Sequence, residues 1–106
     1  MKPLLYGYMR VASNALGDEI DQERHRLAEF AELEGFTLAH IFVDVVRSSA
    51  SAFDALLAAL KGSEVNDVIV PSPWHLASLP GLQAAVRHQL ELETGAHLWT
   101  VQGNKP

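Results

Sequence analysis

The feature that most constrains the fold is an alternation of short apolar segments with longer amphipathic ones. Four segments have the branched and aromatic composition of buried strands: 4–11, 36–43, 67–70 and 97–101. Three segments between them repeat apolar residues at helical spacing: 18–34, 52–61 and 80–94. Strands that alternate with helices predict a three-layer α/β domain, in which helices cover both faces of a mostly parallel sheet of four to five strands.

Local signals refine these boundaries. Ser51 and Asp54 have the spacing of a capping box, which predicts the start of a helix at residue 52. Gly62 is placed to end that helix in a left-handed conformation. Pro71 and Pro73 forbid both a continued strand and a helix after the third strand.

Composition predicts one domain over residues 1–106, with a polar tail at 102–106. The 13 acidic residues outnumber the 8 Lys and Arg, and the resulting charge of -5 disfavours autonomous DNA binding. There is no cysteine, so no disulfide framework is expected. No apolar run approaches the length of a membrane span, and we expect a cytoplasmic protein without membrane contact.

The first strand carries a family motif. Its segment Tyr8-Met9-Arg10-Val11-Ala12-Ser13 resembles the Y-x-R-V-S opening of serine recombinase (resolvase/invertase) catalytic domains, whose Ser is the nucleophile. Ala12 occupies the place of that nucleophile. Asp21-Gln22 is similar to the family's D-Q in the first helix, and residues 41–44 are similar to its I-F-x-D. The resemblance covers residues 4–101 and implies a resolvase-like fold.

The chain also departs from this family pattern. Family members have S-G and then an Arg at the start of the second helix, where this chain has Arg47-Ser48 and then Phe53. The family's D-R-L-S-R signature aligns with residues that keep only its Leu: Trp74, His75, Leu76, Ala77 and Ser78. The resemblance implies a serine hydroxyl that attacks a phosphodiester and arginines that stabilise the transition state. We therefore expect no recombinase activity.

The resemblance also implies a long dimerisation helix and a C-terminal DNA-binding domain, and neither is expected within these residues. What remains of the family's site is a degenerate set at the carboxyl ends of the strands, where α/β folds bind ligands. Its members are Tyr8, Arg10, Ala12, Ser13, Gln22, Asp44, Phe53, Trp74, His75 and Ser78.

Several of these residues allow two interpretations. Ser13 either presents a displaced hydroxyl to a substrate or caps a turn. Arg10 and Asp44, at neighbouring strand ends, either form a structural ion pair or hold a small anion, and Gln22 is expected to hydrogen-bond near the same strand end. His75 invites a role as general base or metal ligand, but the histidines show no metal spacing, so no metal or cofactor is predicted.

Apolar side chains suggest a partner. Trp74 either anchors a protein partner from a rigid loop or folds back over space left by the absent arginines. The stripe of Phe53, Leu56, Leu57 and Leu60 is expected in the core. A second stripe is mostly core but leaves apolar surface near the last helix, and with Trp74 it gives the predicted partner-binding set: Trp74, Leu79, Leu82 and Val86.

Three functions remain open at this point. The first is a non-catalytic domain that acts in protein–protein interaction or regulation, as a homodimer or with another protein. The second is an accessory protein that docks on DNA beside a partner, for which Lys2, Arg10, Arg47 and Lys105 supply a thin basic patch. The third is an enzyme with repurposed chemistry around Arg10, Ser13, Asp44 and His75.

Overall fold

One parallel sheet organises the chain. The computed structural model describes residues 2–12, 14, 17–46, 51–77 and 80–101. Its strands pair in the order β2-β1-β3-β4, with every pair parallel. Their bounds are β1 Leu4–Val11, β2 Thr37–Val45, β3 Asp67–Val70 and β4 His97–Thr100. The predicted α/β fold class is confirmed, and each strand lies within two residues of its predicted bounds.

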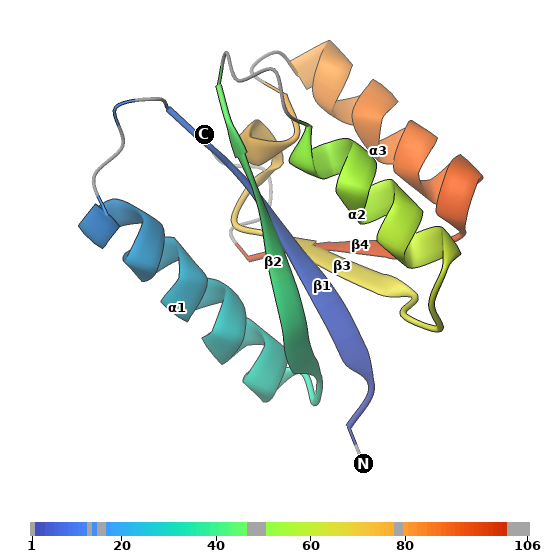
Figure 1. Ribbon diagram of the computed structural model, residues 1–106, viewed down its shortest axis with the longest axis horizontal. Coiled ribbons are helices and arrows are strands. Elements are labelled where there is room, and N and C mark those ends of the chain that lie inside the picture. The colour runs from blue at the N-terminus through green and yellow to red at the C-terminus, as the bar shows by residue number, and fades with distance from the viewer. Residues whose placement is uncertain (1, 13, 15–16, 47–50, 78–79, 102–106) are drawn as a thin grey trace.

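Helices cover both faces of the sheet (Figure 1). Helix α1 (Gly17–Leu33) lies on one face, while α2 (Ala52–Lys61) and α3 (Pro80–Thr94) lie side by side on the other. Each pair of consecutive strands is joined through a helix, as parallel pairing requires. This arrangement gives three layers, as the sequence predicts.

The two faces of the sheet bury separate apolar clusters. Under α1 the cluster contains Leu5, Met9, Leu27, Ala31 and Ile69. Under α2 and α3 the fully buried members include Leu56, Val68, Val70 and Leu90. Glycine at position 7 lets α1 approach the sheet, because a Cβ there would lie 3.1 Å from the Leu27 Cδ1 atom.

The helix ends confirm one local prediction and correct another. The Asp54 amide donates to Ser51 Oγ at 3.1 Å, so Ser51 is the N-cap of α2 as its spacing predicts. The left-handed conformation predicted for Gly62 is wrong, because its φ is -96°. Its amide continues the helical pattern by donating to the Ala58 carbonyl oxygen at 3.0 Å. The left-handed ends are at Gly35 (φ 84°) and Gly95 (φ 71°).

Two connections differ from the sequence-based expectation. Strand β2 continues to Val45, so Asp44 belongs to the strand and does not follow it. After β3, the segment with two prolines forms a single 3-10 turn, η1 (Pro73–His75). Such a turn is compatible with proline at its first position, which needs no amide donor.

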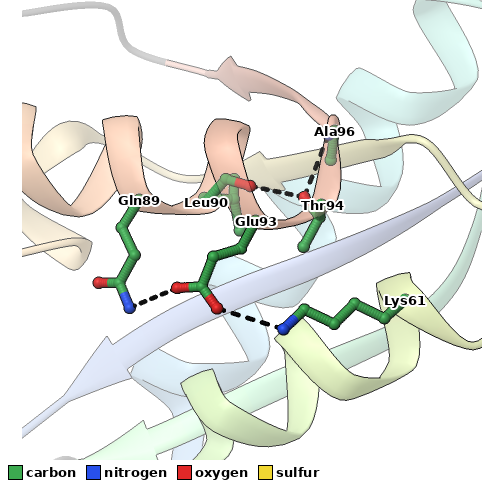
Figure 2. Close-up of polar contacts among 6 residues, drawn as sticks. All are labelled: Lys61, Gln89, Leu90, Glu93, Thr94 and Ala96. Atoms are coloured by element: carbon green, nitrogen blue, oxygen red, sulfur yellow. Dashed lines mark hydrogen bonds and ion pairs between the residues drawn. The ribbon is translucent and has the colours of Figure 1, made fainter.

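The outer faces of α2 and α3 are linked by polar contacts (Figure 2). Lys61 Nζ of α2 lies 3.2 Å from Glu93 Oε1 of α3, and Gln89 Nε2 donates to Glu93 Oε2 at 2.8 Å. These side chains are exposed, so solvent screens the ion pair. No helix among the described residues is long and apolar enough to cross a membrane.

Candidate functional site

The carboxyl ends of β1 and β2 bring two of the predicted site residues together. In the register of the sheet, Arg10 of β1 is the partner of Asp44 of β2. The amino end of α2 is bound to Asp44 of β2, whereas the turn η1 follows β3, which is the neighbour of β1 on its other side in the sheet. The carboxyl ends of the strands are where ligands gather in parallel α/β folds.

Asp44 is bound to the start of α2. One carboxylate oxygen, Oδ1, accepts from the Ala52 amide at 2.6 Å, and Oδ2 accepts from the Phe53 amide at 3.0 Å. These amides have no partner within the helix, since they belong to its first turn. A carboxylate there also interacts favourably with the helix dipole. Asp44 therefore serves as an anionic cap on α2.

Tyr8 completes this cluster from β1. Its hydroxyl donates to Asp44 Oδ2 at 2.6 Å, and its ring meets the Phe53 ring edge-on at a centroid distance of 5.5 Å. Burial, followed by the hydrogen bond to Asp44, raises the pKa of Tyr8 well above its usual range, while the Arg10 charge opposes the shift. Tyr8 is thus a hydrogen-bond donor held in its neutral form.

The ion pair expected between Arg10 and Asp44 is absent from the described residues, and that interpretation is wrong. The two residues are neighbours in the sheet, but the helix amides and the Tyr8 hydroxyl hold the carboxylate. Fixed backbone donors hold a carboxylate at a smaller cost in side-chain entropy than a long arginine. Arg10 is instead exposed beside a hollow on the other side of β1.

This hollow, of about 340 Å³, lies between the end of β1, the first turns of α1 and η1. Its lining includes six polar or small residues: Arg10, Ala12, Glu19, Gln22, Glu23 and His75. The structure thus brings together four residues of the predicted set, namely Arg10, Ala12, Gln22 and His75. Two carboxylates face one guanidinium, so the hollow is acidic on balance.

His75 closes one wall of the hollow. Its Nδ1 atom accepts from the Arg10 backbone amide at 3.0 Å, and its Nε2 atom lies 4.0 Å from Glu23 Oε2. Burial lowers the pKa of His75, and the nearby Glu23 carboxylate opposes that shift. The imidazole is therefore neutral at pH 7 and acts as an acceptor for the backbone.

Sequence reasoning missed Glu19 and Glu23. They stand one helical turn apart on α1, so both side chains project towards the end of β1. That spacing was available in the sequence, but only the fold reveals which strand end it faces. Among the described residues, no cluster of three His, Asp or Glu side chains has the arrangement of a metal site.

The remaining predicted residues divide into two groups. Ser13, Ser78 and Leu79 lie outside the described residues, as do Arg47, Ser48 and the tail at 102–106. Trp74 in η1 is 37% exposed, and Leu82 on α3 is 53% exposed. Val86 is half-buried and packs on the core beneath α3, so within the described partner-binding set Trp74 and Leu82 offer apolar surface.

Fold and site define a class of protein: a three-layer α/β domain whose polar residues gather where β1 and β2 end, beside the first turn of α2. The family model of the resolvase N-terminal domain matches residues 5–105. The chain therefore belongs to the resolvase N-terminal domain family. No curated protein sequence matches it.

Solved structures of serine recombinases share this fold. The C-terminal catalytic domain of ISC1926 TnpA, an IS607-like serine recombinase, is 17% identical with a TM-score of 0.78, over 97% of this chain and 70% of that one. A resolvase family site-specific recombinase from Streptococcus pneumoniae is 20% identical with a TM-score of 0.76, over 95% and 73%. The N-terminal catalytic domain of TP901-1 integrase is 18% identical with a TM-score of 0.74, over 92% and 76%.

Proposed function

We propose that this resolvase-type domain is a cytoplasmic, non-catalytic module that acts through protein–protein contacts. The observation that carries the proposal is the hollow at the end of β1. There Ala12, at the position that the resemblance assigns to the nucleophile, lines the hollow together with Glu19, Glu23 and Arg10. The described residues that line the hollow include no hydroxyl nucleophile, and their carboxylates outnumber their guanidinium group, which disfavours binding of a phosphodiester.

The chemical argument begins with the nucleophile. An alanine methyl has no lone pair, and in another hydrolase the loss of the nucleophile alone lowers turnover by about 10⁶. The transition state of phosphoryl transfer also carries negative charge, which clustered cations must stabilise. Two carboxylates beside one guanidinium raise its energy instead.

Three residues of the degenerate set have structural contacts in this chain. Asp44 and Tyr8 stabilise the start of α2, and the His75 ring binds the backbone of β1. Each of these groups has a hydrogen-bonded partner within the chain. Their arrangement supports conservation of the fold without conservation of the reaction.

Exposed apolar side chains support the contact with a protein. Trp74, Leu82 and Leu92 are 37%, 53% and 72% exposed, respectively. Trp74 lies in a short turn beside the hollow, and aromatic side chains of this kind dominate the binding energy of many interfaces. A second copy of the chain and a different protein are both possible partners under this proposal.

A DNA-cleavage assay tests the absence of chemistry. The purified chain is incubated with supercoiled plasmid, and nicked circles and covalent protein–DNA adducts are measured. We expect neither product, and we expect Ala12→Ser to remain inactive because the hollow stays acidic. Cleavage by the unaltered chain that disappears in Ser13→Ala would overturn the proposal and favour repurposed chemistry at that hydroxyl.

A binding comparison tests the contact surface. Proteins retained from the native host by the unaltered chain are identified, purified and titrated against Trp74→Ala. We expect a loss in affinity of at least about tenfold for an interface anchor. Leu33→Ala, which alters a side chain 83% exposed on α1, is the matched control and should leave affinity unchanged. Equal affinity for both variants would exclude Trp74 as the anchor.

A further inference from the structure

The imidazole of His75 takes the place of a strand partner for β1. Strand β3 pairs with β1 at Tyr6 and Gly7, and then ends at Val70 before Pro71. Further along β1, the Arg10 amide points to the turn η1 and donates to His75 Nδ1 at 3.0 Å. In a longer sheet a backbone carbonyl would accept such a bond.

This bond depends on the protonation state of the ring. Nδ1 accepts only when it carries no proton, which places the proton of the neutral ring on Nε2. A second proton would turn Nδ1 into a donor that faces the Arg10 donor. Glu23 Oε2, 4.0 Å from Nε2, is positioned to attract the resulting imidazolium towards α1.

The charged surroundings of the ring come from two elements. Arg10 of β1 and Glu19 and Glu23 of α1 line the hollow around it. Helix α3, which also packs against η1, contributes the neutral Gln83, whose side-chain amide donates to the Ala77 carbonyl oxygen at 3.0 Å. The side chain of His75 is 19% exposed, so water reaches the ring to deliver a proton.

The turn that carries His75 is anchored on both sides, because Ser72 before it and Leu76 and Ala77 after it are buried. Its own backbone bond runs from the His75 amide to the Ser72 carbonyl oxygen at 3.1 Å. Ser72 is buried and remains an anchor, whereas Trp74, between them, is 37% exposed. Displacement of the ring would change the position of the exposed Trp74, while the buried Ser72 and Leu76 hold the two ends of the turn in place.

From this geometry we infer that His75 is a proton-sensitive latch: its neutral ring holds η1 against β1, and protonation releases the turn and repositions Trp74. This inference rests on the proposed function, since it regulates the side chain proposed to bind a partner. The burial that lowers the pKa of His75 keeps the latch closed at neutral pH, so that it opens only in acid below the usual titration range of a histidine.

Nuclear magnetic resonance of the isolated chain between pH 7.5 and 4.5 tests the latch. The indole N–H signals of Trp74 and Trp99 are followed together with the ring carbons and nitrogens of His75. We expect the neutral ring to have its proton on Nε2, and the Trp74 signal to shift with the midpoint of His75. Trp99, whose Nε1 donates to Asp67 Oδ1 at 3.0 Å, reports on the sheet and should not move.

Three variants separate the latch from a general effect of acid. His75→Asn keeps an acceptor near the Nδ1 position but does not titrate, so the Trp74 signal should no longer respond to pH. His75→Phe removes the acceptor, and the Arg10 amide should exchange with solvent about tenfold faster than in the unaltered chain at neutral pH, a difference that should vanish below the midpoint of His75. Glu23→Gln should move the midpoint to lower pH, because the carboxylate favours the charged ring.

A Trp74 signal that ignores the titration of His75, or one that still responds in His75→Asn, would overturn the latch. A neutral ring protonated on Nδ1 would overturn it as well. None of these outcomes bears on DNA cleavage or on binding by Trp74 at neutral pH, which test the proposed function separately. Conversely, the Trp74 signal could follow the titration of His75 while Trp74→Ala binds the partner normally. That result would refute the role of Trp74 as anchor and leave the latch intact.

Discussion

The two sides of β1 are held at its carboxyl end in different ways. On the side of α2, the Tyr8 hydroxyl and two helix amides converge on the Asp44 carboxylate, at 2.6 to 3.0 Å. On the side of η1, a single imidazole nitrogen accepts from the Arg10 amide. The first arrangement is built from several charge-assisted bonds and is expected to be rigid. The second depends on one bond to a titratable imidazole, whose pKa burial lowers.

The difference indicates which part of the site has a structural role. A carboxylate that caps a helix is needed for the fold whether or not the domain cleaves DNA. The positions that the resemblance assigns to phosphate-binding arginines carry no such constraint here, and His75 occupies the first of them. The Asp44 side of the site therefore has a role in stability. Under the proposed function, the η1 side is available for contact with a partner.

The largest expected effect comes from removal of the Asp44 carboxylate. Asp44→Ala leaves the Tyr8 hydroxyl and the amides of Ala52 and Phe53 without their acceptor, and should lower the free energy of unfolding by about 3 kcal/mol. Urea denaturation followed by circular dichroism measures it. Asp54→Asn changes a first-turn carboxylate that lacks these contacts, and should cost only about 0.5 kcal/mol. Similar losses for both would mean that Asp44 acts through the helix dipole alone.

Tyr8→Phe sharpens the same comparison with a smaller change. It removes the hydroxyl but keeps the ring against Phe53, and should cost about 1 kcal/mol. Tyr6→Phe on the same strand is the control. In the Asp44→Ala background the cost of Tyr8→Phe should fall close to zero, because the bond is already gone. Additive losses would show that the Tyr8 hydroxyl has another partner.

The fold was accessible from the sequence, whereas the site was accessible only in part. Alternating strand and helix patterns predict the sheet and its two covered faces, and the Ser51 cap is a local signal that spans three residues. The contact between His75 and Glu23 joins residues 52 apart in sequence, so no local pattern contains it. The pairing of Arg10 with Asp44 failed for a related reason. The sequence correctly placed Arg10 and Asp44 at adjacent strand ends. It did not show that the α2 amides compete with Arg10 for the carboxylate, because that depends on where the helix begins in space.

Because η1 is bound to β1 through the imidazole of His75, the free energy of unfolding should depend on pH. Burial keeps the pKa of His75 in the folded chain below the unfolded value of about 6.5. The unfolded chain then binds more protons in that window, so stability is complete above about pH 6.5 and is lost as the pH falls towards the folded pKa. Urea midpoints at pH 7.5 and 5.0 should differ less in His75→Asn than in the unaltered chain. An equal pH dependence in both would assign it to other groups.

The smallest effect is expected at the exposed contact between α2 and α3 (Figure 2). It tests whether the stability that a carboxylate contributes depends on the number of its polar contacts or on their burial. Glu93 accepts from Gln89 and Lys61, and the bond from Gln89, then that from Lys61, lowers the pKa of Glu93. Any stability from this shift is present above the unfolded pKa and is lost as the pH falls through the folded value. Because Glu93 is exposed, water and salt screen these contacts, and Glu93→Gln should leave the urea midpoint unchanged within error at pH 7. If Glu93→Gln shifted the urea midpoint as much as Tyr8→Phe does, burial would not be the reason why the contacts of Asp44 stabilise the fold more than these surface contacts.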